Sequence, residues 1–447
     1  MKKHVTILLM AVFCQQVVQA QDTIPVTFEE AVAFGIQQNL EFKKLQNQQD
    51  VLRMERLNAQ LSHLPNLNLS NDTYRQIGQQ FQQAEGELIV TNEVNDIISG
   101  RVNSNMTVFN SFQRVNTTKG AKNFEKAGEF GIAHAKQDLI FIIGGQYLQV
   151  LLDEQLYNIA IENLANQTRQ LEQIEGYVEV GLRTLADFYN QKSEVARLET
   201  VALEAKIKWE TDLWELAETL QLPNNTIPKV APIELELQES ALLKNPLDEL
   251  RTLAVDQRND FRQIKSLELA NRNMLAAAKA SYLPRLDAFF NYNTFYTTLD
   301  PRTFSNQFFT IFPQRSYGLS LTIPVFNNFT NRAVVARSRM EFHNQQLDKV
   351  ALERKISQEV KLAYENYKAA IQRQESTQVQ LNAAEEAQTA ISERFRLGIS
   401  NFVDLAQANQ QLVTAQSDFA QAKYTLYFQE VMFKYALGML STDEFLE

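Results

Sequence analysis

The sequence predicts a mainly helical protein whose smaller β part contributes to a barrel shared between chains. Three observations lead to this fold class. Glycine and proline are scarce, with 14 and 10 among 447 residues, which is typical of long helices. Several short motifs occur twice at a nearly constant separation, which indicates an internal structural repeat. Four segments alternate between apolar and polar residues with the period of β-strands.

The repeated motifs define two copies of one structural unit. Each motif of the first half returns in the second half with similar residues in the same order, and the separations are 217, 217 and 219 residues. A chain that repeats its motifs with almost no insertion is typical of a tube or a ring. The pairs are residues 181–188 (GLRTLADF) with 398–405 (GISNFVDL), residues 108–112 (VFNSF) with 325–329 (VFNNF), and residues 63–65 (HLP) with 282–284 (YLP).

We therefore expect two structural repeats joined by a linker. Each repeat should contain an opening helix, a strand pair, a long helix, a tip and a returning helix. The expected boundaries are 21–222 for the first repeat (strand pair 64–112, tip 179–184), 223–246 for an equatorial linker with a short strand at Ile233, Leu235 and Leu237, 247–440 for the second repeat (strand pair 283–326, tip 397–401), and 441–447 for a C-terminal tail.

Residues 1–20 have the features of a secretory signal peptide. Lys2 and Lys3 precede an apolar stretch, and the sequence Val18-Gln19-Ala20 offers small residues at the −3 and −1 positions of a cleavage site. The single cysteine, Cys14, lies in this segment. The exported protein is therefore expected to rely on packing and not on disulfides.

Charge and hydropathy argue against two further classes of protein. The net charge of −10 makes nucleic acid an unexpected partner. No apolar run of about 18 residues follows the signal segment, so no membrane-spanning helix is expected. The nearest candidate, residues 139–152, is interrupted by Gln146 and Gln149 and is expected to be a helix buried against other helices.

Two long segments without proline are expected to form single helices, at about residues 113–178 and 330–396. At about 1.5 Å per residue, each would be on the order of 100 Å long. Thr27 and Glu30 have the spacing of a capping box at the start of the first short helix. Two short helices laid end to end match one long helix, so each repeat supplies a helical hairpin. The expected short helices are residues 28–62, 185–220, 250–281 and 402–440.

The alternating segments have one apolar face and one face of small or polar residues. An ordinary sheet with one wet face shows the same pattern, but two strand pairs at matching positions in an exported chain favour lipid-facing barrel strands. Long polar loops, residues 77–99 and 297–314, are expected between the strands of each pair. The segments lie at about residues 66–74, 102–108, 286–293 and 317–325.

Four strands cannot close a barrel, for which about eight are the minimum. An open sheet in lipid would leave unpaired backbone groups at its edges, each costing several kcal/mol. Several chains must therefore share one barrel, and three chains would supply twelve strands together with twelve helical rods around the same axis. Such an assembly is expected to act as a channel that conducts solutes along this axis.

The ordered set of motifs resembles that of the TolC-type outer-membrane efflux channel family over the whole exported chain. The resemblance implies a homotrimeric channel with a 12-stranded barrel in outer-membrane lipid and a coiled-coil tunnel in the periplasm. It also implies docking with a periplasmic adaptor (a membrane fusion protein) and an inner-membrane pump of RND or ABC type. The exported substances would be drugs, other toxic small molecules or, as in type I secretion, polypeptides. No cofactor and no enzymatic activity are expected.

The resemblance also assigns roles to the two tips. Asp404 matches an acidic gate position of the family, and the family's second aspartate falls on Gln407. An arginine that follows the second tip glycine in the family falls on Ser400, while Arg183 holds the equivalent place in the first tip. Asp187 is the counterpart of Asp404. The residues expected to dock the adaptor are Gly181, Leu182, Arg183, Leu397, Gly398, Ile399 and Ser400.

A simpler role competes for the two aspartates. Thr184 to Asp187 and Asn401 to Asp404 both have the spacing of a capping box, which places an acid at the third helical residue. Capping alone would account for both residues. For Asp404, a ring of carboxylates at a constriction would also select for cations.

Two other classes of function remain as alternatives. A soluble periplasmic coiled-coil adaptor would need one central hairpin and a compact β domain, which two hairpins and two strand pairs fit poorly. An enzyme or a metal site would need clustered ligands or nucleophiles. The four histidines, His4, His63, His134 and His343, are scattered along the chain.

Overall fold

The computed structural model describes residues 22–84, 87–92, 94–223, 226–233 and 240–440. The predicted signal peptide, the predicted C-terminal tail, and Leu235 and Leu237 of the expected linker strand lie outside these ranges. The chain divides into two compact units. Apart from the gaps in these ranges, the first unit comprises residues 22–45, 132–259 and 353–440, and the second comprises residues 46–131 and 260–352.

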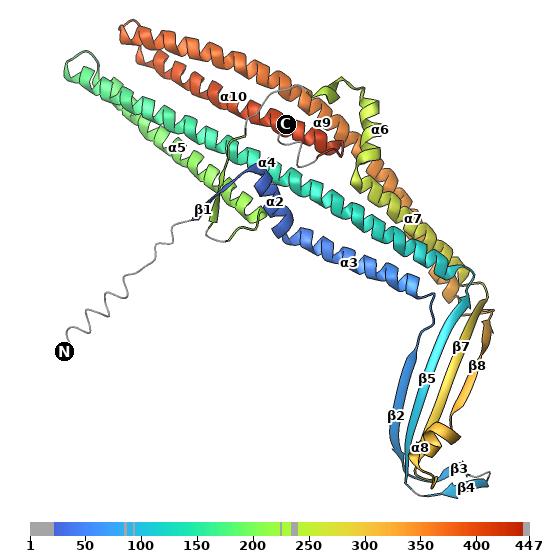
Figure 1. Cartoon of the computed structure of the whole chain (residues 1–447). Coiled ribbons are helices and arrows are strands. Elements are labelled where there is room, and N and C mark those ends of the chain that lie inside the picture. Colours follow the sequence, from blue (N-terminus) through green and yellow to red (C-terminus); the bar gives the residue numbers. More distant parts are fainter. Residues whose placement is uncertain (1–21, 85–86, 93, 224–225, 234–239, 441–447) are drawn as a thin grey trace, which may run out of the picture. The chain divides into compact units, whose positions relative to one another are not determined.

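The helices follow the predicted pattern closely. The two long helices are 67 residues each, and the two returning helices are 35 residues each, so these predictions are confirmed. In Figure 1, α5 runs back along α4 and α10 runs back along α9. The helices are α2 (Phe28–Gln38), α3 (Leu40–Leu61), α4 (Gln113–Glu179), α5 (Leu185–Thr219), α6 (Leu247–Gln257), α7 (Asn259–Ala280), α8 (Phe304–Asn306), α9 (Thr330–Arg396) and α10 (Phe402–Ala436), with a 3₁₀ turn at Ala241–Lys244 and a π-helical turn at Gln307–Ile311.

Each expected opening helix is in fact two helices, which corrects the prediction. Asn39 separates α2 from α3, and its side-chain oxygen accepts a hydrogen bond from the amide of Phe42 at 3.0 Å. Arg258 separates α6 from α7. The apolar periodicity continues through both breaks, which is why the sequence did not reveal them. The capping box of Thr27 and Glu30 is present as predicted.

A short parallel strand pair was not predicted. β1 (Asp22–Val26) pairs with β6 (Thr226–Val230), about half the chain away. The buried hydroxyl of Tyr147 on α4 lies 2.8 Å from the carbonyl oxygen of Ala231 and 3.2 Å from that of Val26, so it joins the ends of both strands. Burial raises the pKa of Tyr147 to about 12.

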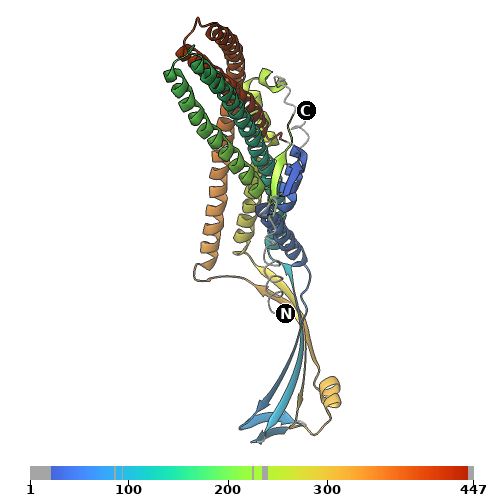
Figure 2. The same cartoon turned by 90° about the vertical axis from the view of Figure 1, so that its left-hand side faces the viewer.

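Four antiparallel strands form the main sheet, in the order β2-β5-β7-β8, and they lie side by side in both views (Figure 1, Figure 2). Directly opposed residues share a face: Leu286 with Leu321, Ala288 with Leu319, and Phe290 with Tyr317. The predicted alternation is therefore correct for this face. The strands are β2 (Asn68–Gln76), β5 (Asn95–Phe109), β7 (Arg285–Thr297) and β8 (Gln314–Thr322).

The expected polar loop at residues 77–99 is wrong in part. β5 begins at Asn95, and a separate hairpin of β3 (Gln80–Ala84) and β4 (Glu87–Thr91) lies inside the segment. The alternation of apolar and polar residues is broken at Ile97, Ile98 and Ser99. The strand conformation of this segment is therefore set by its pairing with β2 and β7 and not by the local pattern. β8 ends at Thr322, before the last apolar positions of its predicted segment.

A buried carboxylate pair lies between α4 and α5, the hairpin of the first tip. Asp153 and Asp212 are both buried, and Lys208 Nζ lies 2.5 Å from Oδ1 of Asp212 and 3.7 Å from Oδ2 of Asp153. Burial and a hydrogen bond with Asp212 raise the pKa of Asp153 to about 6. For Asp212, burial is outweighed by its contacts with Asp153 and Lys208, which lower its pKa. The pair therefore takes up its proton at Asp153.

The end of α10 is packed against the break between α6 and α7. Gly438 has a φ of +74°, and its amide donates to the carbonyl oxygen of Tyr435 at 2.9 Å. A Cβ at Gly438 would lie 2.9 Å from Cα of Arg258. The buried guanidinium of Arg258 pairs with Glu359 on α9 at 2.6 Å, so this junction fixes three helices of the first unit.

We predict that Gly438→Ala destabilises the protein more than Gly181→Ala. Both glycines have a φ of +74°, which costs an L-residue roughly 1–2 kcal/mol. At Gly181 a Cβ would meet nothing within 4 Å, whereas at Gly438 it would also meet the backbone of Arg258. Thermal unfolding of the two purified variants should therefore give the lower Tm for Gly438→Ala. Equal Tm values would show that the close approach is not a constraint.

We predict that the α4–α5 hairpin becomes less stable as the pH rises from about 4 to about 6. A carboxyl whose pKa is raised on folding favours the folded state below its unfolded value near 3.8, and this contribution is lost as pH rises through about 6. Hydrogen exchange of the α5 amides, measured at pH 4.5 and 7, reports the local stability. Asp153→Asn should remove most of the difference, and Asp187→Asn, which changes a half-exposed carboxylate at the start of α5, should leave it. An unchanged profile in Asp153→Asn would contradict the assignment.

Candidate functional site at the hairpin tips

Both long helices end in the same backbone motif. In the first tip, the amide of Gly181 donates to the carbonyl of Val178 at 3.0 Å, and that of Leu182 to the carbonyl of Tyr177 at 2.8 Å. The second tip repeats this pattern at Gly398 and Ile399, with distances of 3.0 and 2.9 Å. This is the Schellman motif, which requires a left-handed residue, and both glycines have φ near +74°. The tip glycines therefore have a defined backbone role.

Each tip exposes a pair of large apolar side chains. Leu182 and Ile399, which follow the two glycines, are exposed, and so are the residues that precede them, Val180 and Leu397. Three of these four residues belong to the surface predicted for docking. Val180 was missed, because the prediction began at the glycine. Its position relative to Leu397 in the aligned tips could have indicated it.

The first tip has a complete capping box. The amide of Asp187 donates to Oγ1 of Thr184 at 3.2 Å, and the amide of Thr184 donates to Oδ2 of Asp187 at 3.2 Å. The hydroxyl of Thr184 also donates to the same carboxylate oxygen at 2.9 Å. The carboxylate of Asp187 is thus engaged at the start of α5.

The second tip differs from the capping box that the spacing predicted. The amide of Asp404 donates to Oδ1 of Asn401 at 2.9 Å, but the carboxylate of Asp404 accepts from the hydroxyl of Ser400 at 2.9 Å. Only one of the two hydrogen bonds of a capping box is therefore present. The carboxylate of Asp404 accepts from the hydroxyl of Ser400 and not from the backbone amide of Asn401. Asp404 and Gln407 are both exposed, three residues apart on α10, so they lie on one face of the helix.

Arg183 connects the two tips within the chain. Its Nη2 donates to the carbonyl oxygen of Phe395 on α9 at 3.2 Å, and the guanidinium carbon lies 4.1 Å from the centroid of the Phe395 ring. A cation above an aromatic ring is attracted by the ring's negative face. The sequence assigned Arg183 to the docking surface, and its contact with the second hairpin was not anticipated.

Between the tips and the core, amide side chains form hydrogen bonds both within each hairpin and from one hairpin to the other. Gln388 on α9 donates to Asn409 on α10 at 3.0 Å, and Asn409 lies 3.5 Å from Oε1 of Gln170 on α4. Gln191 on α5 donates to the carbonyl oxygen of Gln167 on α4 at 2.9 Å. These residues belong to or border a polar cavity of about 430 Å³.

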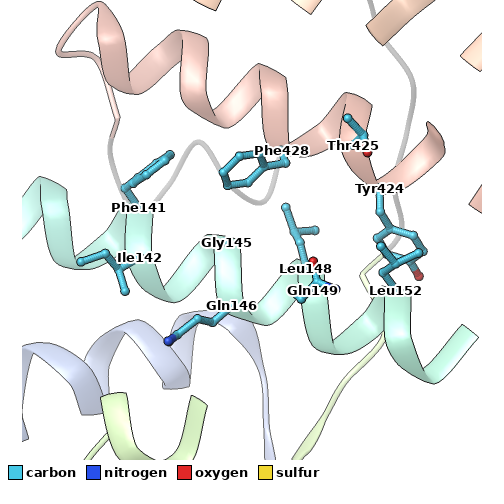
Figure 3. Close-up of a pocket in the computed structure, with 10 residues that line it drawn as sticks. All are labelled: Phe141, Ile142, Gly145, Gln146, Leu148, Gln149, Leu152, Tyr424, Thr425 and Phe428. Carbon is cyan, nitrogen blue, oxygen red and sulfur yellow. The ribbon is translucent and has the colours of Figure 1, made fainter. Parts of the chain in front are cut away.

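An apolar groove of about 380 Å³ lies between α4 and α10. Figure 3 shows the ring of Phe428 facing Gly145, where an added Cβ would lie 3.1 Å from the ring. The glycine thus permits close packing of the two helices. Burial raises the pKa of Tyr424 at the end of the groove, and the nearby Glu154 adds to the shift. The groove presents few polar groups for a ligand.

Neither a metal site nor a membrane-spanning helix is found in the part of the chain that the structure describes. Within those residues, no group of three or more His, Cys, Asp or Glu side chains is placed to hold a metal ion. Among the described helices, none is both long and apolar enough to cross a membrane.

Comparison with solved structures shows that the fold is a known one. The outer membrane channel CmeC of Campylobacter jejuni superposes with a TM-score of 0.80 over 92% of this chain and 85% of that chain, at 15% sequence identity. The expected combination of helical hairpins with a small sheet is therefore confirmed as the fold of an outer-membrane channel.

Sequence comparisons agree with the fold. The family model described as outer membrane efflux protein matches residues 250–439. The outer membrane protein TolC of Vibrio cholerae serotype O1 is 20% identical over 355 residues, which cover 79% of each chain. TolC of Escherichia coli K12 is 22% identical over 284 residues, covering 62% of this chain and 57% of that protein. The chain is therefore similar in sequence to TolC-type outer membrane efflux proteins over much of its length, and it shares the fold of such channels.

Proposed function

We propose that this protein is the outer-membrane channel of a tripartite efflux system, which conducts small molecules or polypeptides from the periplasm and an inner-membrane pump to the exterior. Similarity to outer membrane efflux proteins supports a channel and not the alternative of a soluble adaptor. The observation that carries the proposal is the sheet, because one of its faces is apolar and exposed in the single chain. Tyr317, Leu319 and Leu321 of β8 all have exposed side chains on that face.

The sheet also supports a shared barrel. Its order places β2 and β8 at the two edges, where backbone groups need partners in lipid. Four strands are too few to close on themselves, and three chains would give a barrel of twelve. TolC-like channels are trimeric in general, and we extend this to a homotrimer of the present chain. The face opposite the apolar one, which includes Asn291, Asn293 and Ser316, would line the pore.

The helical hairpins are proposed to form the periplasmic tunnel. A helix of 67 residues is on the order of 100 Å long, several times the membrane core of about 30 Å. The exposed apolar pairs at the tips, together with the glycine turns, fit a surface that docks a periplasmic adaptor. The adaptor would connect the channel to an inner-membrane pump of RND or ABC type.

We propose that Asp404 and Gln407 face the narrow entrance at the tips, with Asp187 in a mainly structural role. The carboxylate of Asp187 is tied into a capping box, whereas that of Asp404 is exposed and accepts from the Ser400 side chain. In a trimer, three copies of Asp404 would form a ring that favours cations.

We predict that Asp404→Asn lowers cation selectivity more than Asp187→Asn does. The first change removes three charges from the proposed entrance, and the second removes three charges that are engaged in capping. Reversal potentials across a planar bilayer under a salt gradient measure the selectivity of each variant. Equal shifts, or no shift with Asp404→Asn, would argue against a gate at this residue.

We predict that cysteines placed on the two edge strands form cross-links between chains. The pair Ser70→Cys on β2 with Ser316→Cys or Ser320→Cys on β8 should give covalent dimers and trimers on a non-reducing gel after oxidation. As a matched control, Ser70→Cys with Arg101→Cys should cross-link within one chain, since these residues are directly paired in the sheet. Edge-strand cysteines that link only within one chain would refute the shared barrel.

A further inference from the structure

We propose that the loop between β7 and β8 lies on the outside of the barrel. Its aromatic side chains would insert into the acyl-chain region, just below the head groups of the outer leaflet. The inference rests on the proposed function and deepens it, because it assigns this loop to lipid and not to the pore. The name aromatic foot is used here for Phe304, Phe308, Phe309 and Ile311. The sequence predicted only a long polar loop at this place.

The foot is held in a defined shape by one buried glutamine. The side chain of Gln307 is fully buried, and its Oε1 accepts from the amide of Thr297 at 3.0 Å. Its Nε2 donates to the carbonyl oxygens of Asp300 at 3.0 Å and Arg302 at 2.6 Å. Asp300 and Arg302 form an ion pair with each other, so their charges are matched inside the loop. A loop whose buried polar groups are hydrogen-bonded in this way can hold its apolar side chains in a fixed position.

The foot packs on the apolar face of the sheet. The hydroxyl of Thr294 donates to the carbonyl oxygen of Phe308 at 2.5 Å, and the Phe304 ring contacts the ring of Tyr296 edge-on at 5.3 Å. Gly100, directly opposite Thr294, leaves room for the Phe308 ring, which would lie 2.7 Å from an added Cβ. In Figure 2, α8 stands out from one side of the sheet.

The register of the strands identifies this side as the one proposed to face lipid. Thr294 and Tyr296 alternate with Asn293, and they share their face with Tyr292 and Phe290 further along β7. Phe290 in turn lies opposite Tyr317, whose side chain is 82% exposed. The foot therefore continues the exposed apolar band of the strands, and the polar face is the other one. The rings of Phe304 and Phe308 therefore lie on the side away from the proposed pore.

The exposure of the foot supports lipid as its occupant. Phe304, Phe309 and Ile311 remain 41%, 65% and 39% exposed although neighbouring rings pack together. The rings of Phe304 and Phe308 stack at 4.9 Å, and that of Phe309 lies edge-on to Phe308 at 5.2 Å. Phe312 leaves the cluster and stacks on Phe295 of the opposite face. Girdles of aromatic residues at the membrane interface are typical of outer-membrane barrels, and continuity with the apolar band places these rings there.

Site-directed spin labelling of the full chain tests the proposal. Cys14 is the only cysteine and lies in the predicted signal segment, so a Cys14→Ala background gives single-cysteine variants. Phe309→Cys and Ile311→Cys would carry the label on the foot, Leu319→Cys on the apolar face and Asn291→Cys on the polar face. In proteoliposomes, collision rates with oxygen, which concentrates in lipid, are compared with those of a water-soluble nickel chelate.

We expect the labels at positions 309 and 311 to collide several-fold more with oxygen than with the nickel chelate, as the label at 319 does, while the label at 291 shows the reverse. If the labels on the foot collide mainly with the chelate while the label at position 319 still collides mainly with oxygen, the foot does not lie in lipid. That result would overturn this inference and leave the proposed channel function intact. Labels on the foot that reach neither reagent would also overturn it, in favour of contact with a neighbouring subunit. Chelate-dominated collisions at 319 would overturn both the foot and the proposed barrel.

Discussion

The hydrogen-bonding requirement of the sheet edges is the constraint from which the rest of this protein follows. In lipid, an unpaired backbone group costs several kcal/mol, because no water is present to replace the missing partner. β2 and β8 lie at the edges of a sheet that is too small to close. We propose that the chain satisfies these edges by pairing with further copies of itself. A closed ring of strands with a polar interior would be the consequence, and conduction would follow from that geometry.

The two tips show how a repeated structure can acquire separate roles. Both use the same glycine turn with almost identical hydrogen bonds, so the backbone is equivalent in the two hairpins. The side chains that follow differ. Arg183 reaches across to Phe395, whereas Ser400 turns back to Asp404. The first tip therefore contributes a contact between hairpins, and the second keeps an exposed carboxylate. This difference between the tips follows from single residues and requires no change in fold.

The sequence predicted the long elements well because their signals are local. A helix such as α9 has no proline over its 67 residues, so its ends at Thr330 and Arg396 could be placed closely. The glycine tips were recognised because they occur twice. At the candidate site, the spacing around Asp187 predicted a capping box that is present, and the spacing around Asp404 predicted one that is only half formed.

The elements that were missed depend on partners far away in the chain. β1 becomes a strand because β6 lies beside it, more than 200 residues later, and neither segment has a strong pattern of its own. The aromatic foot is similar, since it packs against Gly100 of β5, which lies in the first half of the sequence, as well as against Thr294 of the adjoining β7. Local composition described that loop as polar, and only the register of β5 and β7 reveals which face its rings occupy.

The pairing of Asp404 with Gln407 bears on what the channel would conduct. Two carboxylates per chain at these positions would bring six negative charges together in a trimer, and their mutual repulsion would be strong in a narrow, poorly solvated entrance. Gln407 halves that number and replaces a fixed charge with an amide that can both donate and accept hydrogen bonds. The hydroxyl of Ser400 further spreads the charge of each Asp404. An entrance built in this way would still favour cations, but it would hold them less tightly and would admit neutral or zwitterionic solutes with a smaller electrostatic penalty.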